Sequence, residues 1–325
     1  MDTTFASAAA DIPGGFACRI CGCESGQKVI GREQFFGTGE EFEYFECGEC
    51  GCVQIVDIPN DLSAYYPRDY YSLVAPERNA RRRIKAFVIR VVIDVTSLTP
   101  ILQLIRSRST GIAFWVRLQA LCRDKRARIL DVGAGGGDFV QMLRMIGFDS
   151  ASGVEPHLAE DRLEGGRMLV RKGDLSSIEG EWDLICFNDV LEHLADQEGT
   201  LSQARRLLAQ GGRILVRVPV VGGEAWRLYG QHWAGFDAPR HLYLHSRRSL
   251  EVVAEQAGLT VESLEYDSTA FQFEGSEMIR AGLPLTAGRE TMAEAFRQAG
   301  FAKRARALNR SGEGDHLAMV LRANR

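Results

Sequence analysis

The strongest constraint on the fold of this chain is a glycine-rich segment that follows a short β-type run. The run covers residues 128–131, and Asp-Val-Gly-Ala-Gly-Gly-Gly-Asp occupies positions 131–138. Glycines placed there allow positive φ angles and let a ligand approach the backbone. The next β-type run ends at Glu155, 22 residues after Gly133, where a carboxylate can accept both ribose hydroxyls of a nucleoside. The segment therefore predicts a nucleoside-binding α/β domain.

The residues around this segment alternate between strand and helix patterns. The expected strands are 128–131, 152–155, 168–171, 182–187 and 213–218. The expected helices between them are 138–146, 157–164 and 197–208. Strands that alternate with helices in this way are typical of a parallel sheet.

A dehydrogenase is the natural alternative for a glycine-rich α/β fold. Its loop usually reads G-x-G-x-x-G and holds a pyrophosphate at a helix N-terminus. Here Gly133, Gly135 and Gly137 repeat at every second position, and the segment 188–193 has no evident role in hydride transfer. The spacing favours a different nucleoside cofactor.

Six of the eight cysteines lie within residues 18–52, in two near-copies of C-x-x-C-G-C. Two C-x-x-C pairs separated by 25 residues predict a tetrahedral zinc site. Its expected ligands are Cys18, Cys21, Cys47 and Cys50. Disulfides are the alternative, but no export signal supports an oxidising compartment. Cys23 and Cys52 are spare, although either could replace a ligand. Strands at 28–36 and 41–46 would complete a small ribbon whose folding energy the metal supplies.

Charge divides the chain into an acidic module, a basic connector and a main domain. Residues 1–77 carry four basic and thirteen acidic side chains, whereas residues 78–128 carry thirteen basic and two acidic ones. Helices are expected in the connector at 84–95, 98–105 and 112–121. Its basic side chains either solvate the outer helix faces, which we favour, or contact an acidic partner such as a phosphorylated substrate, RNA or an anionic membrane.

Four tyrosines stand within seven residues between the ribbon and the connector, at Tyr65, Tyr66, Tyr70 and Tyr71. One interpretation is a packed hinge between modules. The other is an aromatic wall over a substrate pocket, with hydroxyl groups available as donors.

As a set, the main-domain motifs resemble the class I S-adenosylmethionine (SAM)-dependent methyltransferases. The matching residues are 131–137, Glu155, Asp174, 188–194 and 208–213, and the resemblance runs from residue 128 to about residue 269. The four-cysteine ribbon, the Tyr-rich hinge and Asp-Ala-Pro-Arg-His-Leu at 237–242 further resemble the zinc-ribbon-bearing bacterial branch. Members of that branch methylate sugars, natural products and other small molecules.

The resemblance implies an α/β fold: a Rossmann-like seven-stranded methyltransferase sheet with an N-terminal zinc ribbon and a helical connector. The last strand, 316–321, would be antiparallel, and 259–267 would be the strand before it. The expected domains are a zinc ribbon (1–60), a Tyr-rich hinge with a basic helical connector (61–127) and a SAM-binding domain (128–325). Residues 270–312 would form an insertion or lid.

Family roles carry over to individual cofactor residues. Gly133, Ala134 and Gly135 would face the methionine part, and Glu155 would hold the ribose. Asp174 and Leu175 would bracket the adenine, while Asn188 and Asp189 would lie beside the sulfonium. The full expected cofactor set is Asp131, Gly133, Ala134, Gly135, Gly137, Glu155, Asp174, Leu175, Asn188 and Asp189.

The candidate catalytic residues are His241, Asp237 and His193. His241 follows the fifth strand of the main domain, near the edge where such sheets bind ligands, so it could serve as base or substrate orienter. The alternative is that it caps a helix starting near Ser246. Asp189, Glu192 and His193 would share one helical face. With His241 they resemble the Glu-x-x-Glu-His pattern of methyltransferases that bind a divalent ion, with Asp189 replacing the first Glu.

These observations predict a SAM-dependent methyltransferase that acts on a small, hydroxylated metabolite or sugar, on oxygen, nitrogen or carbon. The alternatives are an RNA methyltransferase that binds through ribbon and connector, and a non-catalytic SAM-binding scaffold. The acidic ribbon speaks against nucleic acid. Without a secretory signal or transmembrane segment, the protein is expected to be cytoplasmic, with peripheral membrane contact through the connector as an option.

Overall fold

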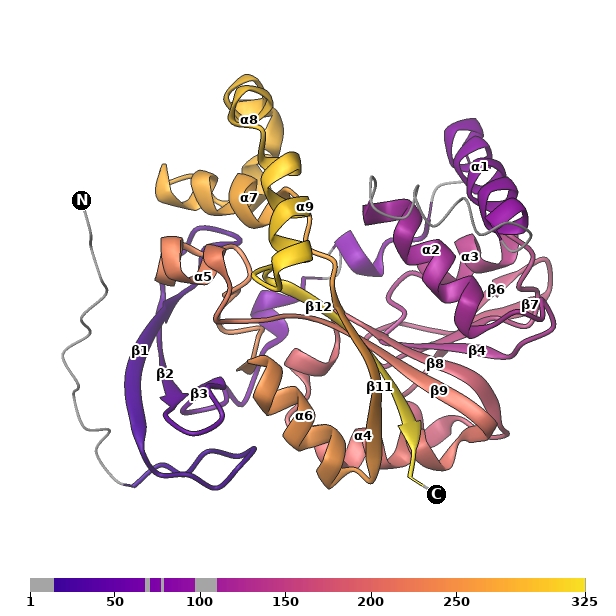
Figure 1. The fold of residues 1–325 in the computed structure, drawn as a ribbon, viewed down its shortest axis with the longest axis horizontal. Helices are drawn as coiled ribbons and strands as arrows, with labels where there is room; N and C mark the ends of the chain where they lie inside the picture. Colours follow the sequence, from indigo (N-terminus) through magenta and orange to yellow (C-terminus); the bar gives the residue numbers. More distant parts are fainter. Residues whose placement is uncertain (1–14, 68–70, 77–78, 97–109, 325) are drawn as a thin grey trace.

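The computed structural model describes residues 15–67, 71–76, 79–96 and 110–324, which form two sheets with flanking helices (Figure 1). The larger sheet has the strand order β11-β12-β9-β8-β4-β5-β7-β6. Its strands are β4 (Ile129–Val132), β5 (Ser152–Glu155), β6 (Arg162–Glu164), β7 (Arg167–Lys172), β8 (Trp182–Asn188), β9 (Leu208–Pro219), β11 (Leu259–Tyr266) and β12 (His316–Ala323). The sheet has the Rossmann-like arrangement that the resemblance implied, with one strand more than the seven expected, and its last strand is antiparallel to both neighbours, as expected.

Strand residues alternate between two buried faces because successive side chains in a strand point in opposite directions. Ile129, Leu184 and Leu215 face one core, which they share with α1 (Ala80–Thr96), α2 (Thr110–Leu121) and α3 (Asp138–Met145). Leu130, Ile185 and Ile214 face the other core, with α4 (Gln197–Arg206) and α6 (Arg247–Gln256). Helices therefore cover both faces of the sheet, as parallel strands require.

The helix expected at 157–164 is wrong, and its last residues form the eighth strand, β6. β6 pairs antiparallel with β7, with Glu164 opposite Arg167. Gly165 and Gly166 close this hairpin with φ angles of 57° and 77°. Two consecutive left-handed residues make a tight hairpin turn, which explains why the chain reverses there.

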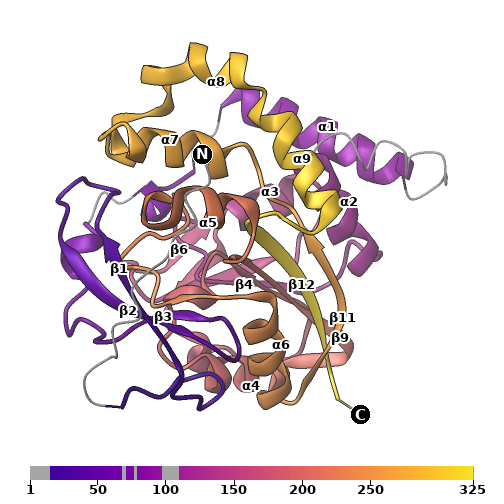
Figure 2. The same cartoon turned by 60° about the vertical axis from the view of Figure 1, so that its left-hand side comes forward.

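The smaller sheet joins distant parts of the sequence. It contains β1 (Gly26–Arg32), β2 (Glu41–Cys47), β3 (Val53–Ile55) and β10 (Tyr243–Leu244), in that order. β10 follows β9 along the chain, and Tyr243 pairs with Gln54. The N-terminal ribbon is thus completed by a piece of the main domain, and its core includes Trp233 and Phe236. Figure 2 shows this sheet on one side of the larger one.

Helices fill the remaining segments. In the connector, α1 and α2 occupy two of the three expected positions, and the expected helix at 98–105 lies outside the described residues. α5 (Glu224–Tyr229) follows β9. Between β11 and β12 come α7 (Phe271–Arg280), α8 (Ala293–Ala299) and α9 (Phe301–Ser311), which gather above α5 in Figure 1. Within the described ranges, no helix is both long and apolar enough to cross a bilayer.

Candidate active site

A cavity of about 1540 Å³ opens at the carboxyl ends of the parallel strands. One part is lined by residues that follow β4, β5, β7 and β8. The other part is lined by residues of the loop after β9 and by the neighbouring ends of β11 and β12. Six of the expected cofactor residues line it: Gly133, Glu155, Asp174, Leu175, Asn188 and Asp189. The candidate catalytic residues Asp237, His193 and His241 line it as well.

The glycine loop and Glu155 form one hydrogen-bonded unit. Gly133, Gly135 and Gly137 have φ angles of 67°, 51° and 91°, which residues other than glycine rarely adopt. The Gly135 N–H donates to Glu155 Oε2 at 3.0 Å, and the His157 N–H donates to Oε1 at 2.9 Å. These hydrogen bonds hold the Glu155 carboxylate at the end of β5, where the sequence predicts a carboxylate that binds the ribose.

Four expected cofactor residues are not among those that line the cavity, namely Asp131, Ala134, Gly135 and Gly137. Asp131 is buried in β4 and accepts a hydrogen bond from Asn188 Nδ2 at 3.0 Å. Burial raises the pKa of Asp131 to about 7. Gly137 precedes the first residue of α3 and turns the chain into that helix.

The hinge covers the glycine loop, a contact that sequence reasoning missed. The Gly136 N–H donates to the Ser72 carbonyl at 2.6 Å, and Arg162 donates to the Leu73 carbonyl at 2.6 Å. A side chain at Gly135 would come within 2.2 Å of the Ser72 carbonyl oxygen. Because Gly135 and Gly136 have no side chains, the backbone of the hinge, as well as a ligand, can approach the glycine loop.

His193 and His241 stand together in the part of the cavity that the loop after β9 lines, with ring centroids 4.7 Å apart. His193 Nδ1 lies 2.8 Å from the Arg240 carbonyl, and His241 Nδ1 lies 2.9 Å from the Gly235 carbonyl. A carbonyl can only accept, so each Nδ1 carries the hydrogen and each Nε2 is left as an acceptor. Burial lowers the pKa of both rings, that of His193 to about 4. Both are neutral near pH 7.

One residue of the Tyr-rich segment, Tyr66, reaches this pair. The Tyr66 hydroxyl lies 3.1 Å from His193 Nδ1, and the Tyr66 ring stacks on His157. Tyr65 instead donates to Glu40 on the outside of the ribbon. Tyr70 and the side chain of Tyr71 lie outside the described residues. Ser246 caps α6, so the alternative role of His241 as a helix cap is wrong.

Two acidic side chains accompany the histidines. Glu192 is fully buried, and in the described part of the chain neither of its carboxylate oxygens has a hydrogen-bond partner. Burial raises its pKa well above the usual range. Its Oε1 lies 3.9 Å from His241 Nε2, and Asp237 Oδ2 lies 3.6 Å from the same atom. Asp237 forms a two-point ion pair with Arg240.

The expectation that Asp189 shares a helical face with Glu192 and His193 is wrong. Asp189 follows β8 with a φ of 54°, so no α-helix begins there, and residues 191–193 form a single 3-10 turn. The Asp189 carboxylate turns away to His316. Ligand atoms of Glu192, His193 and His241 nevertheless lie within 4.8 Å of one another.

His316 is a site residue that the sequence did not reveal. Its Nε2 lies 2.7 Å from Asp189 Oδ1 and its Nδ1 lies 2.6 Å from Asp267 Oδ1, while Arg217 pairs with Asp267 at 2.9 Å. Burial alone would lower the pKa of His316, but the two carboxylates outweigh it and raise the pKa to about 10. The proximity of Asp267 and His316 could have been predicted from the expected pairing of the last two strands, because these residues lie at adjacent ends of the two antiparallel strands.

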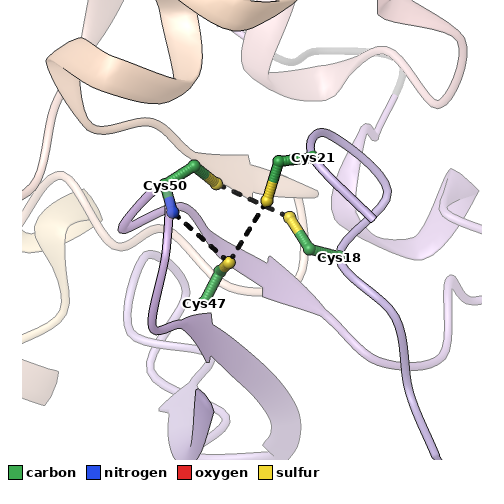
Figure 3. Close-up of side chains that lie close together, drawn as sticks. All are labelled: Cys18, Cys21, Cys47 and Cys50. Atoms are coloured by element: carbon green, nitrogen blue, oxygen red, sulfur yellow. Dashed lines mark hydrogen bonds between the residues drawn. The ribbon is translucent and has the colours of Figure 1, made fainter. Parts of the chain in front are cut away.

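The four expected zinc ligands converge at the end of the ribbon (Figure 3). The Sγ atoms of Cys18 and Cys50 lie 3.6 Å apart, and those of Cys21 and Cys47 lie 3.5 Å apart. Four sulfurs about 2.3 Å from one zinc ion stand about 3.8 Å from one another, whereas a disulfide needs about 2.05 Å. The Cys18–Cys50 contact lowers the pKa of Cys18 to about 4 and raises that of Cys50. Cys23 and Cys52 are outside this cluster.

Comparison with known proteins defines the class. Residues 106–264 match the family described as a methyltransferase domain. With the sheet and its glycine loop, this match identifies that part of the chain as a class I SAM-dependent methyltransferase domain.

Individual relatives are more distant. A ubiquinone biosynthesis O-methyltransferase of a Caulobacter species is 30% identical over a stretch that covers 31% of this chain and 48% of that protein. An uncharacterized protein of Methanocaldococcus jannaschii is also 30% identical, over a stretch that covers 29% of this chain and 45% of that protein. The chain thus spans about half the length of the curated relatives it matches. A solved SAM-dependent methyltransferase from Archaeoglobus fulgidus is 17% identical, with coverage of 66% and 94% and a TM-score of 0.41.

We expect His316→Gln to destabilise the protein in a pH-dependent way. Because the folded state raises the pKa of His316 from its usual 6.5 to about 10, the extra stability of the wild type is complete below pH 6.5 and fades as the pH approaches 10. Urea unfolding of both proteins across this range measures the difference. His232→Gln, on the turn after α5, is the control. An advantage that stays constant with pH would contradict a charged His316.

Proposed function

We propose that the chain transfers a methyl group from SAM to a small, hydroxylated acceptor such as a sugar. One observation carries this proposal: a single cavity borders both the nucleoside-type loop and a cluster of histidines and carboxylates, of which Glu192 and His241 are buried. The sulfonium is an activated leaving group, so the protein chiefly aligns the reactants and provides for the acceptor's proton. The polar acceptor part of the cavity suits a hydroxylated molecule.

For the cofactor we propose the roles that the resemblance implies. Glu155 would hold the ribose, and Asp174 and Leu175 would bracket the adenine. Gly133, Ala134 and Gly135 would face the methionine part. The Asn188 and Asp189 pair would lie beside the sulfonium. Asp131 and Gly137 would support the loop from behind, which fits the burial of Asp131 and the position of Gly137 before α3.

We expect Glu155→Gln to weaken SAM binding at least about 10-fold, because the ribose hydroxyls would lose hydrogen bonds to a charged carboxylate. Titration calorimetry with SAM, and separately with NAD, measures this. The control is Glu160→Gln, which changes an exposed carboxylate five residues away. Tight NAD binding without a response to SAM would contradict the cofactor assignment.

At the acceptor part, we propose that His241, His193 and Asp237 receive the acceptor hydroxyl. The unprotonated Nε2 of His241 can accept its proton. Asp237, 3.6 Å away, would stabilise the resulting imidazolium. Burial alone would raise the pKa of Asp237, but Arg240 outweighs it and lowers the pKa, so this carboxylate stays ionised. The Tyr66 hydroxyl would orient His193 or the acceptor.

A second proposed role for Glu192, His193 and His241 is to hold a divalent cation. This role is favoured because, among the described residues, neither oxygen of the buried Glu192 carboxylate has a hydrogen-bond partner. One potential ligand atom from each of Glu192, His193 and His241 lies within 4.8 Å of the other two. Each histidine presents its Nδ1 to a backbone carbonyl, which is how metal-binding histidines are commonly oriented. When bound, such a cation would coordinate acceptor hydroxyls and lower their pKa. Asp189 would take no part.

We expect His241→Gln to lower methyl transfer at least about 100-fold with little change in SAM affinity. The assay is labelled SAM with a panel of nucleotide sugars and polyhydroxylated metabolites, and His232→Gln is the control. Loss of SAM binding would mean that His241 is structural.

The same assay separates the two roles of this group. Brief chelation that leaves the ribbon zinc in place should not change activity if His241 acts as a base. Activity that is lost and then restored by Mg²⁺ or Mn²⁺ supports the cation.

An RNA acceptor is the alternative, and an RNA arm in the same panel tests it. The net acidity of residues 1–77 opposes a polynucleotide partner. We also propose a cytoplasmic location, which fits an arrangement of the four ribbon cysteines as zinc ligands rather than as disulfides.

We also propose a structural zinc ion on Cys18, Cys21, Cys47 and Cys50. The two knuckles have matching backbone bonds, from the Gly22 N–H to the Cys18 carbonyl and from the Gly51 N–H to the Cys47 carbonyl. Bound zinc would supply folding free energy to a module too small for a large core. The ribbon in turn holds the loop that carries His241, because the Tyr44 hydroxyl donates to the His241 carbonyl at 2.9 Å.

Elemental analysis should find about one zinc per chain in the wild type and in Cys23→Ser, and much less in Cys47→Ser. Because the ribbon supports the acceptor loop, Cys47→Ser should lose methyl transfer while SAM affinity is largely kept. Zinc loss in Cys23→Ser, or a disulfide among the four ligands in reduced protein, would refute the assignment.

A further inference from the structure

Helix α1 presents a row of large apolar side chains to solvent. We call this row the α1 stripe; it consists of Ile84 (63% exposed), Phe87 (67%), Val88 (47%), Val91 (43%) and Val95 (45%). Among the described residues, five of the nine exposed large apolar side chains lie on this one helix. Single exposed apolar residues are ordinary, but a contiguous row marks a contact surface.

The α1 stripe is distinct from the face by which the helix packs on the protein. That face carries Ala86, Ile89 and Ile93, which are buried in the core shared with α2 and α3. At 3.6 residues per turn, these positions lie on the side of the helix opposite Ile84, Val91 and Val95. The helix is therefore apolar on two opposite faces, and among the described residues only the face with Ala86, Ile89 and Ile93 is buried in a core.

Basic side chains border the α1 stripe on both sides. By helical spacing, Arg81 and Lys85 lie along one edge, and Arg83 and Arg90 lie along the other. The one acid of the helix, Asp94, lies 3.7 Å from Arg90 and 3.8 Å from Lys125. An apolar row between two basic borders is typical of a helix that lies in the plane of a membrane surface.

We propose that α1 binds an anionic membrane surface, with the α1 stripe at the headgroup–acyl boundary and the basic borders among the lipid phosphates. Charge decides between occupants. Pairing with a second copy would bring the same basic borders together, which is unfavourable, whereas anionic lipid complements both borders at once. In both views α1 lies on the side of the molecule away from β1–β3, so the acidic ribbon would face away from the membrane (Figures 1 and 2).

The contact would connect membrane binding to the cavity wall. Ser72 and Leu73, shortly before α1, line the cavity. Arg82 reaches from α1 to Asp138 at the start of α3, with one bond to its backbone carbonyl at 2.7 Å. The helix thus remains fixed to the domain while its outer face meets lipid. This inference concerns α1 alone and does not rest on the proposed methyl transfer.

Vesicle co-sedimentation tests the proposal, with phosphatidylcholine alone and with equimolar phosphatidylcholine and phosphatidylglycerol. The full chain should bind the anionic vesicles preferentially. The triple variant Ile84→Ser, Phe87→Ser, Val91→Ser should bind at least about 10-fold more weakly. Its matched control is Leu163→Ser with Leu228→Ser, two exposed apolar residues elsewhere. That control should bind like the wild type.

A second variant tests the basic borders. We expect the affinity for anionic vesicles to fall about fivefold per substitution, and its salt dependence to flatten, in the variant Arg81→Gln, Arg83→Gln, Lys85→Gln. Its control is Arg248→Gln, Lys303→Gln, Arg310→Gln, which removes the same charge from exposed positions on α6 and α9. Unchanged melting temperature and SAM affinity show that each variant is folded.

Several results would overturn the proposal. They are failure of the wild type to bind anionic vesicles, equal binding to both lipid mixtures, and wild-type binding by the triple variant. A dimer that the serine variant dissociates, without vesicle binding, would assign the α1 stripe to a second copy. Binding of an acidic protein through α1, without vesicle binding, would assign it to that partner.

Discussion

The pairing of β3 with β10 is the contact on which the part of the cavity lined by Asp237 and His241 depends. Asp237 and His241 lie in residues 233–242, which form no helix or strand of their own. The backbone of this segment is held instead by the ribbon: the Ile55 N–H donates to the Leu242 carbonyl, and the Tyr44 hydroxyl donates to the His241 carbonyl. Buried backbone groups need partners, so the ribbon's presence decides where His241 stands.

Three of the histidines that line the cavity differ in charge, although desolvation acts to lower the pKa of each. His193 and His241 meet backbone carbonyls through Nδ1, and burial keeps both neutral. His316 lies between two carboxylates, which keep it charged despite burial. The same side chain thus provides proton acceptors at one wall and a fixed positive charge at another, because the neighbouring charges differ.

Backbone strain is concentrated in this cavity as well. Among the described residues, Asp189 and Asp237 alone are non-glycine residues with a positive φ, at 54° and 46°, and both line the cavity. Asx residues tolerate this conformation better than most side chains, but it still costs free energy. Their surroundings hold them there: Asp189 is bound to His316, and Asp237 is bound to Arg240.

The sequence by itself determined the parallel sheet, the glycine loop with Glu155 and the four-cysteine cluster, whereas the antiparallel last strand was implied only by the family resemblance. The sheet, the loop and the cluster depend on local spacing, since glycines, strand periodicity and paired cysteines constrain the chain within a few residues. Only the tertiary structure decided that β6 is a strand, that Asp189 turns to His316, and that β10 joins the ribbon. The α1 stripe also became visible only there, because sequence periodicity marks apolar faces without showing which face a neighbour covers. Those outcomes depend on contacts between residues far apart in the chain, whose geometry no local pattern specifies.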